Sequence, residues 1–356
     1  MSRFLTEKFA SLVPYVPGEQ PRDMKYLKLN TNESPFPPSP KAQELINSTS
    51  AALLRLYPDP TGQELISALS EYYGLPQERL YVTGGSDEAL FYAFLAFCDE
   101  KTPAVFPDVT YGFYSVLADL LHINARRIPL RDGFELKPED YYDAGGTVVI
   151  ANPNAPTGRA IPLSDIAEIC RRNRDNIVII DEAYVDFGSE SAVKLLPEFE
   201  NLLVIQTFSK SRSLAGARIG FSAASPEIIE DLVKLKFSMN PYDLTRLSIS
   251  AGAAAVKDTG YFDECRKRII ETREYTSSEL KRLGFDVIDS MTNFVFASPR
   301  VMSGEEYYLA LKSRGVLVRY FGTPRTSAYV RITIGTQSDM ERFISVTADI
   351  LKEVSG

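Results

Sequence analysis

Three apolar runs in the middle of the chain set its main pattern. They cover residues 147–151 (TVVIA), 177–181 (IVIID) and 202–207 (LLVIQT), and a polar loop follows each of them. Their apolar residues are continuous and do not alternate with polar ones, which is typical of parallel strands in a sheet covered on both faces. Helix-like stretches, notably 163–174, separate the runs. These repeated strand–helix units predict a doubly wound α/β domain with a mainly parallel sheet.

The residues before these runs continue the alternation. We expect helices over 41–55 and 62–73 and a short strand over 81–83. The glycine pair at 84 and 85 predicts a turn, and Ser86 can cap a helix that extends to about residue 98. That helix is apolar on nearly every face, so we expect it to be buried between layers.

The pattern changes towards both ends of the chain. Residues 1–40 contain clustered prolines, which exclude regular helix and central strand, so we expect an arm that docks on the rest of the chain. Residues 41–245 form the predicted large domain. Residues 246–356 have the pattern of a smaller α+β domain, with a long helix over 246–283, strands near 285–297 and 328–334, a helix near 303–314 and a terminal helix from 338.

Composition narrows the chemistry. The formal net charge is −8, so nucleic acids and anionic membranes are not expected partners. No apolar run reaches the roughly 18 residues that a membrane span needs. His122 is the only histidine, and Cys98, Cys170 and Cys265 lack metal-site spacing, so we expect no metal site and a reducing, cytoplasmic location. Motifs of phosphate-binding loops and serine hydrolases are absent. The chemistry is therefore expected to use an organic cofactor or Lys, Asp, Tyr and Arg side chains.

Reactive side chains follow the predicted strands at their carboxyl ends, where open α/β sheets bind ligands. The second strand leads into Asp181 and Tyr184, and the third into Lys210, with Arg218 eight residues later. A lysine at such a position can form a Schiff base with an aldehyde cofactor. A carboxylate can keep a pyridine nitrogen protonated, so that the ring withdraws electrons, and a tyrosine can bond the ring oxygen.

A phosphate site is predicted beside these residues. The helix that starts after Gly85, with Ser86 and Asp87 in its first turn, offers backbone N–H groups to a phosphate. Arg218 would complete the site, together with two hydroxyl residues, Thr207 and Ser209.

Together these motifs make the chain similar to a known family. LNTNESPFPP (29–38), RLYPDP (55–60), ANPNAPTG (151–158), VIIDEAYVDF (178–187) and TFSKSRSLAGARIGF (207–221) resemble the pyridoxal-phosphate-dependent aminotransferases of fold type I, and most closely the histidinol-phosphate aminotransferases. The resemblance covers nearly the whole chain. It implies a large doubly wound domain, a smaller α+β domain, and pyridoxal 5′-phosphate as the cofactor.

The resemblance also implies roles for individual residues. Lys210 would hold the cofactor as a Schiff base and move the substrate proton, Asp181 would pair with the ring nitrogen, and Tyr184 would bond the ring hydroxyl. Tyr111 would stack on the ring. Tyr57 would reach the cofactor phosphate from a partner subunit, which implies a homodimer with shared active sites.

One position departs from the family pattern. The family usually has an asparagine directly before Pro-Thr-Gly that bonds the ring hydroxyl, but this chain has Ala155 there and Asn154 one residue earlier. We expect Asn154 to supply the contact; otherwise Tyr184 would supply it alone.

Three further residues are expected at the substrate. Arg331 matches an arginine that binds the substrate carboxylate in the superfamily, and a planar guanidinium suits a carboxylate or a phosphate. Arg319 would add a second positive charge, as a dianion requires. Tyr15 would close over the site on the proline-rich arm, which would then act as a lid.

These implications give a reaction and leave alternatives open. The expected reaction is ping-pong transamination between L-histidinol phosphate and 2-oxoglutarate, which in the biosynthetic direction of histidine synthesis makes histidinol phosphate from imidazole acetol phosphate and glutamate. An aminotransferase for phenylalanine or tyrosine would use the same cofactor residues and Arg331. A pyridoxal-phosphate decarboxylase of a phospho-amino acid would share the scaffold but release CO₂.

Overall fold

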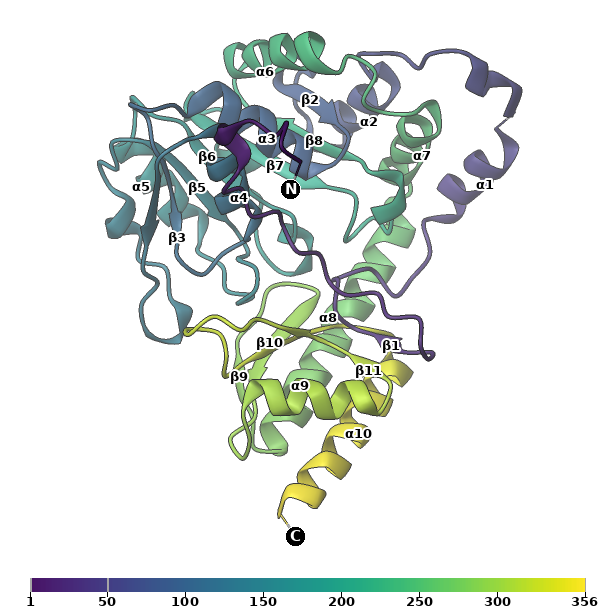
Figure 1. Cartoon of the computed structure of the whole chain (residues 1–356). Helices are drawn as coiled ribbons and strands as arrows, with labels where there is room; N and C mark the ends of the chain where they lie inside the picture. Colours follow the sequence, from purple (N-terminus) through teal and green to yellow (C-terminus); the bar gives the residue numbers. More distant parts are fainter. Residues whose placement is uncertain (1, 50, 356) are drawn as a thin grey trace.

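The structure, a computed structural model, describes residues 2–49 and 51–355 and has two unequal halves (Figure 1). The larger half surrounds a seven-stranded sheet, and the smaller half surrounds a four-stranded sheet. The long helix α8 (Thr259–Arg282) runs from one half to the other. The predicted fold class, a large doubly wound domain with a smaller α+β domain, is confirmed.

The large sheet is parallel except for one strand. Only β8 runs antiparallel to its neighbours β2 and β7. The strands lie in the order β2 (Leu80–Thr83), β8 (Gly220–Ala223), β7 (Leu202–Thr207), β6 (Val178–Asp181), β5 (Thr147–Ala151), β3 (Ala104–Pro107) and β4 (Ala125–Ile128).

Alternate residues of the central strands enter two different hydrophobic cores. In β5, Val148 and Ile150 face one core, whereas Val149 and Ala151 face the other. Successive strand side chains point to opposite faces of a sheet, so a strand buried on both sides must be apolar at every position. This explains the continuous apolar runs in the sequence.

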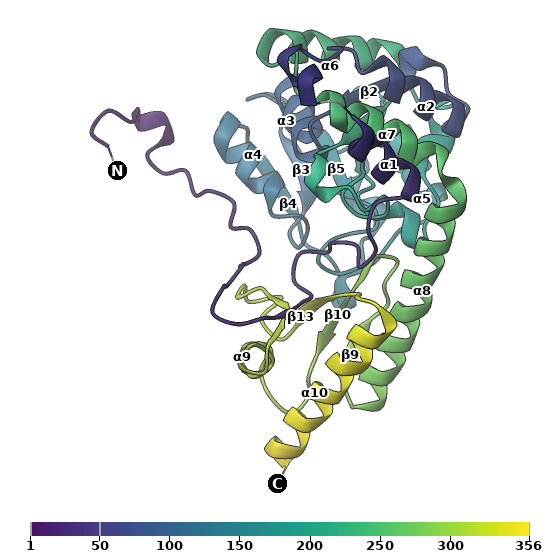
Figure 2. The ribbon, with the colours of Figure 1, turned by 90° about the vertical axis from the view of Figure 1, so that its right-hand side faces the viewer.

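Helices cover both faces of this sheet (Figures 1 and 2). The helices α3, α4 and α6 pack on one face, and α1, α2, α5 and α7 contribute to the core on the other. Their bounds are α1 (Pro40–Ser48), α2 (Gln63–Tyr73), α3 (Ser86–Phe97), α4 (Phe113–Leu121), α5 (Leu163–Arg172), α6 (Pro226–Met239) and α7 (Arg246–Lys257).

The smaller half is an antiparallel sheet with helices α8, α9 (Gly304–Ser313) and α10 (Gln337–Ser355) packed against it. Part of the N-terminal segment belongs to this half, because β1 (Leu27–Lys28) pairs with β11 (Val316–Leu317). The four sheet strands lie in the order β12 (Arg319–Tyr320), β13 (Val330–Thr333), β10 (Phe294–Ser298) and β9 (Asp286–Ile288).

Two predicted helices are each divided in the structure. The helix expected over 41–55 consists of α1 and a 3-10 segment at Ala51–Arg55, with residue 50 outside the described residues. The helix expected over 246–283 is interrupted at Asp258, where the backbone leaves the helical conformation between α7 and α8. Because α7 packs against α1 and α2, the core of the large half extends beyond residue 245.

The N-terminal segment before β1 is extended apart from a 3-10 turn at Glu7–Phe9, and it lies on the side of the molecule that carries α4 (Figure 2). Its Phe9 ring lies 6.0 Å from that of His122, at the end of α4. No helix within residues 2–49 and 51–355 is long and apolar enough to cross a membrane.

Candidate active site

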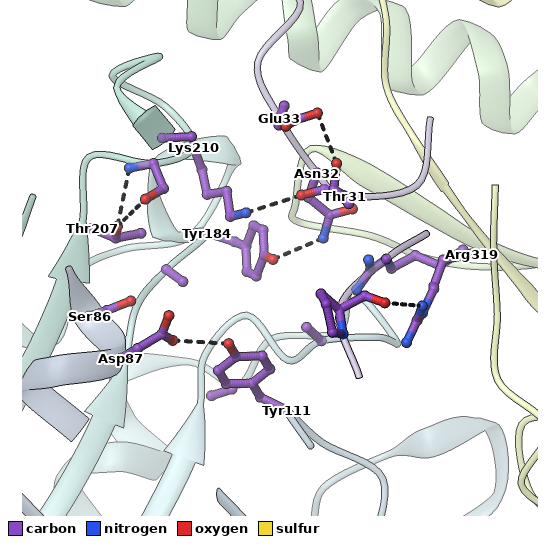
Figure 3. Close-up of a pocket in the computed structure, with 18 of the residues that line it drawn as sticks. Thr31, Asn32, Glu33, Ser86, Asp87, Tyr111, Tyr184, Thr207, Lys210 and Arg319 are labelled. Atoms are coloured by element: carbon purple, nitrogen blue, oxygen red, sulfur yellow. Dashed lines mark hydrogen bonds between the residues drawn. The ribbon is translucent and has the colours of Figure 1, made fainter. Parts of the chain in front are cut away.

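A cavity of about 260 Å³ lies at the carboxyl ends of the central strands and is closed by residues of the smaller half (Figure 3). Strand register places Ala151, Asp181 and Ile205 side by side at this edge. Most of the predicted site residues line the cavity, namely Tyr15, Ser86, Asp87, Tyr111, Asp181, Tyr184, Thr207, Ser209, Lys210, Arg218, Arg319 and Arg331.

Lys210 follows β7 and points into the cavity (Figure 3). Its Nζ donates a hydrogen bond to the Thr31 carbonyl at 3.3 Å and lies 5.9 Å from the centre of the Tyr184 ring. Burial, with a smaller contribution from the Arg331 charge, lowers the pKa of Lys210 to about 8. The amine is thus more readily available in the neutral form, which is the form that attacks an aldehyde.

Asp181 lies at the end of β6, with only 4% of its surface exposed. Tyr114 donates its hydroxyl to one carboxylate oxygen at 2.7 Å, and the backbone N–H of Ala183 donates to the other at 3.2 Å. Burial outweighs these donors and raises the pKa of Asp181 to about 6. A cationic ring nitrogen next to this carboxyl group would restore its charged form.

The first turn of α3 and Arg218 form one end of the cavity. Arg218 donates to Ser209 Oγ at 3.4 Å and to Asp87 Oδ2 at 3.2 Å. Its guanidinium packs against Gly85, where a Cβ would lie only 2.6 Å from Nη2. Gly85 also has a φ of 103°, which side chains disfavour, so this glycine both begins the helix and allows the arginine to approach.

The helix start differs from the sequence prediction. Gly85 is the residue that precedes α3, and Ser86 is its first helical residue, so the predicted capping role of Ser86 is wrong. The backbone at position 85 has the conformation that glycine tolerates, and no side chain caps the helix. The exposed N–H groups of the first turn can therefore bind an anion.

Aromatic side chains form one wall of the cavity. The Tyr111 hydroxyl donates to Asp87 Oδ1 at 3.0 Å, which fixes its ring beside the helix start (Figure 3). The Tyr15 ring meets Tyr111 edge-on at 5.9 Å and Phe113 at 6.0 Å. Through these contacts the N-terminal arm closes one side of the cavity.

Asn154 is not placed as the sequence suggested. Its amide nitrogen donates to the Val109 carbonyl at 2.9 Å and to Thr157 Oγ1 at 3.0 Å, and its oxygen accepts from Thr110. These bonds join the loop after β5 to the loop after β3, and Asn154 does not line the cavity, whereas Ala155 does. We therefore correct the expectation that Asn154 points at a ring hydroxyl.

Arg319 and Arg331 lie directly opposite each other on β12 and β13. Arg319 donates to the carbonyls of Val16 and Pro17 at 2.9 and 3.1 Å, and Arg331 donates to that of Asn30 at 3.0 Å. Neither forms an ion pair with another described residue, and Arg331 Nε is buried without a partner. Like charges opposite each other destabilise a sheet, so this arrangement favours an anion between them.

Tyr57 lies outside the cavity. Its side chain is 77% exposed, and its ring stacks on that of Tyr242 with centres 4.5 Å apart. Its predicted contact with a phosphate in another subunit stays a prediction.

Several residues that contact the site were missing from the sequence prediction. Asn30, Thr31 and Asn32 line the cavity, and Tyr114 holds Asp181. The polar run of Asn30, Thr31, Asn32 and Glu33 directly after an apolar segment was a usable sign, because it marks a loop that leaves a strand. The partner of Tyr114, 67 residues away along the chain, could not be found from local pattern.

The residues that line the cavity fit pyridoxal phosphate. Helix-start N–H groups, Thr207, Ser209 and Arg218 can hold a phosphate, Lys210 can bond an aldehyde, and Asp181 can face a pyridine nitrogen. Within the described residues, no group of three or more His, Cys, Asp or Glu side chains could hold a metal ion.

Comparison with known proteins agrees with this geometry. Residues 24–346 match the model of the family "Aminotransferase class I and II". The histidinol-phosphate aminotransferase of Clostridium acetobutylicum is 49% identical over 97% of this chain and 98% of its own length. That of a Marinomonas species is 51% identical over 96% of this chain and 97% of its own length.

Solved structures show the same fold. The histidinol-phosphate aminotransferase of Sinorhizobium meliloti, in complex with pyridoxal-5′-phosphate, has a TM-score of 0.84 at 22% identity and covers 93% of this chain and 92% of its own. The protein is a pyridoxal-phosphate-dependent enzyme. The chain belongs to the class I and II aminotransferases, in the branch of the histidinol-phosphate aminotransferases.

Proposed function

We propose that this enzyme transfers the amino group between L-histidinol phosphate and 2-oxoglutarate, the reaction that histidine biosynthesis uses in the direction of histidinol phosphate. The observation that carries the proposal is the pair Arg319 and Arg331, which face each other at the cavity without a carboxylate partner among the described residues. Two guanidiniums match the double negative charge of the substrate's phosphate better than they match the single charge of a carboxylate. Relatives of about 50% identity carry the same activity in their names.

The cofactor supplies an electron-withdrawing ring that stabilises the carbanion formed when the substrate loses its α-proton. Lys210 would hold the cofactor through its aldehyde group, and its amine would move the substrate proton. The lowered pKa of Lys210 suits both roles. Asp181 would face the ring nitrogen and keep it protonated. Thr207, Ser209 and Arg218, with the N–H groups of Ser86 and Asp87 at the start of α3, would hold the phosphate.

Tyr111 and Tyr184 would hold the ring in place. Tyr111, fixed by its bond to Asp87, would cover one face of the ring. Tyr184 would bond the ring oxygen. Tyr15 and the arm that Arg319 holds would exclude water while substrate is bound.

The active unit is proposed to be a homodimer. Leu53, Leu54, Leu56, Tyr57 and Tyr242 expose much of their apolar surface, with Tyr57 at 77%. Exposed apolar residues gathered around one segment mark an interaction surface. Tyr57 would reach the cofactor phosphate of the partner subunit. Sedimentation should give twice the chain mass, and a monomer with full activity would contradict this.

The three free, buried cysteines fit a reducing compartment, and we place the enzyme in the cytoplasm on that basis. Because Cys98, Cys170 and Cys265 are all unpaired, reducing agents should leave the free energy of unfolding unchanged.

Steady-state kinetics with L-histidinol phosphate and 2-oxoglutarate test the proposed reaction. Parallel double-reciprocal lines, with one glutamate formed for each histidinol phosphate consumed, are expected for a ping-pong enzyme. Release of CO₂ without a need for 2-oxoglutarate would identify a decarboxylase instead. Turnover of phenylalanine or tyrosine in preference to histidinol phosphate would identify an aromatic aminotransferase.

A further inference from the structure

Asn32 occupies an unusual position between the smaller half and the cavity. It is 1% exposed, and its φ of 56° is in the left-handed region, which asparagine tolerates better than most residues. Its N–H donates to Thr333 Oγ1 at 3.0 Å, and its carbonyl accepts from the Asn293 amide at 2.9 Å. The backbone of Asn32 is therefore held from both sides by the smaller half.

The side-chain amide of Asn32 bridges two hydroxyl groups. The Thr333 hydroxyl donates to Oδ1 at 3.0 Å. Nδ2 donates to the Tyr184 hydroxyl oxygen at 2.9 Å, as Figure 3 shows. Because the amide oxygen accepts from Thr333, the N–H₂ group is the part of the amide that faces Tyr184. Tyr184 is thus an acceptor in the one hydrogen bond that its hydroxyl makes to the described residues.

This bond determines what Tyr184 can offer to a ligand. Because its oxygen accepts from Asn32, its own proton remains for an acceptor in the cavity, and none of the described residues takes it. Its ring is fixed edge-on against Phe294, with centres 5.1 Å apart. Tyr184 is consequently a hydrogen-bond donor whose direction is set before the cofactor binds.

Among the described residues, Asn32 is the one whose side-chain amide bonds the Tyr184 hydroxyl. Ala155 presents only a methyl group to the cavity, and the Asn154 amide is engaged with Val109 and Thr157. Asn30 also lines the cavity, but its amide nitrogen donates to the Glu19 carbonyl at 2.8 Å.

We propose that Asn32 is a positioning residue of the cofactor site, which orients the Tyr184 hydroxyl as a donor to the ring oxygen of pyridoxal phosphate and so replaces an amide at position 155. The inference rests on the cofactor and not on the identity of the amino donor. A hydrogen-bond donor to the ring oxygen draws negative charge away from that oxygen. The oxygen then stabilises the protonated Schiff-base linkage between Lys210 and the cofactor less well. Asn32 therefore lowers the pKa of that linkage.

The substitution Asn32→Asp tests this with little change in shape. Aspartate keeps the acceptor for Thr333 and tolerates the left-handed backbone, but it replaces the donor to Tyr184 with an acceptor. The Tyr184 proton would then turn towards residue 32 and away from the ring. The readout is the pH titration of the visible absorbance band of the cofactor-loaded enzyme without substrate. We expect its midpoint to rise by about one pH unit or more, as for loss of one hydrogen bond to a charged group. An unchanged midpoint would overturn the proposal.

Companion variants separate orientation from charge and from misfolding. Asn32→Gly removes the donor without adding charge and suits the backbone, so it should raise the midpoint too. In a Tyr184→Phe background, Asn32→Asp should cause no further shift, whereas an effect of charge alone would persist there and contradict the proposal. Adding Ala155→Asn to Asn32→Asp should lower the midpoint again. Absence of the band in the unaltered enzyme would refute the cofactor assignment itself, a different outcome from an unshifted band.

Discussion

The protein holds two groups of buried charges, one at the Gly84–Gly85 loop and one in the cavity, and their surroundings differ. At the loop, Lys236 pairs with Asp243 at 2.7 Å, both almost fully buried, and also donates to the Val82 carbonyl. Glu88 and Asp243 both accept from the N–H of Gly84. In the cavity, by contrast, Lys210 and Arg331 have only backbone carbonyls as hydrogen-bond acceptors among the described residues.

This difference indicates that the charges at the loop stabilise the structure, whereas those in the cavity serve to bind ligands. A buried ion pair whose polar atoms have partners holds a loop in place, and removing one member leaves an uncompensated charge. Buried charges that the chain itself leaves without a counter-charge are characteristic of sites that bind charged ligands. Substitutions in the first group should therefore alter folding stability, and substitutions in the second should alter chemistry.

The largest expected effect is that of Lys210→Met. In the proposed function Lys210 would both hold the cofactor and move the proton. Turnover should therefore fall by ~10²–10⁴-fold or more, the range that positioned proton transfer alone contributes. The free energy of unfolding of the cofactor-free protein should stay the same or rise, since an unpaired buried cation is removed. Single-turnover assays and urea denaturation measure the two quantities, and substantial remaining activity would refute the role of Lys210.

Lys236→Met should have the opposite effects, with a loss of stability and little change in turnover. It leaves Asp243 buried without its cation and should lower the free energy of unfolding by roughly 3–5 kcal/mol. Lys234→Met, at an exposed position of the same helix, is the matched control and should change it by less than about 0.5 kcal/mol. Equal stability of the two variants in urea denaturation would mean that the buried pair does not hold the loop.

Arg319→Leu should reduce specificity for a phosphate. Loss of one charged hydrogen-bonding partner is worth about 1.5–3 kcal/mol, so kcat/KM for histidinol phosphate should fall roughly 10- to 150-fold. The value for phenylalanine should fall much less. Arg314→Leu, at an arginine paired with Glu353 away from the cavity, should change neither. A parallel loss for both donors in Arg319→Leu would indicate that this arginine serves only to hold the arm.

The smallest expected effect concerns pH. Burial, and next the neighbouring Asp243 charge, raise the pKa of Glu88 from 4.5 to about 7. Between these values the folded protein binds more protons than the unfolded chain, so Glu88 makes stability fall as pH rises from about 4.5 to about 7. Glu88→Gln should flatten this dependence by on the order of 1 kcal/mol per pH unit. Urea denaturation across this range measures it, and an identical pH profile in the variant would contradict the assignment.

The sequence predicted the part of the site that lies on regular structure. Asp181 and Lys210 follow strands whose apolar runs are unambiguous, and the edge where those strands end is fixed by the parallel sheet. Arg319 and Arg331 were both expected at the substrate, and their pairing across β12 and β13 brings them together.

Contacts between distant segments could not be predicted. The interruption of the helix expected over 246–283, by contrast, has a local signal, because Asp258 and Thr259 are residue types that commonly begin a helix, and α8 begins there. The Asn32–Tyr184 bond joins residues 152 positions apart. The role of Asn154 was predicted from its neighbours in sequence, yet its amide bonds Val109 in the loop after β3, 45 positions away.

The most direct test of the account is the half-reaction of the cofactor-loaded enzyme with single amino donors. L-Histidinol phosphate and L-phenylalanine would be added separately, without 2-oxoglutarate, and the loss of the visible cofactor band followed in time. The account predicts rapid loss with histidinol phosphate and much slower loss with phenylalanine, because only the phosphate engages both Arg319 and Arg331. Faster loss with phenylalanine would contradict it.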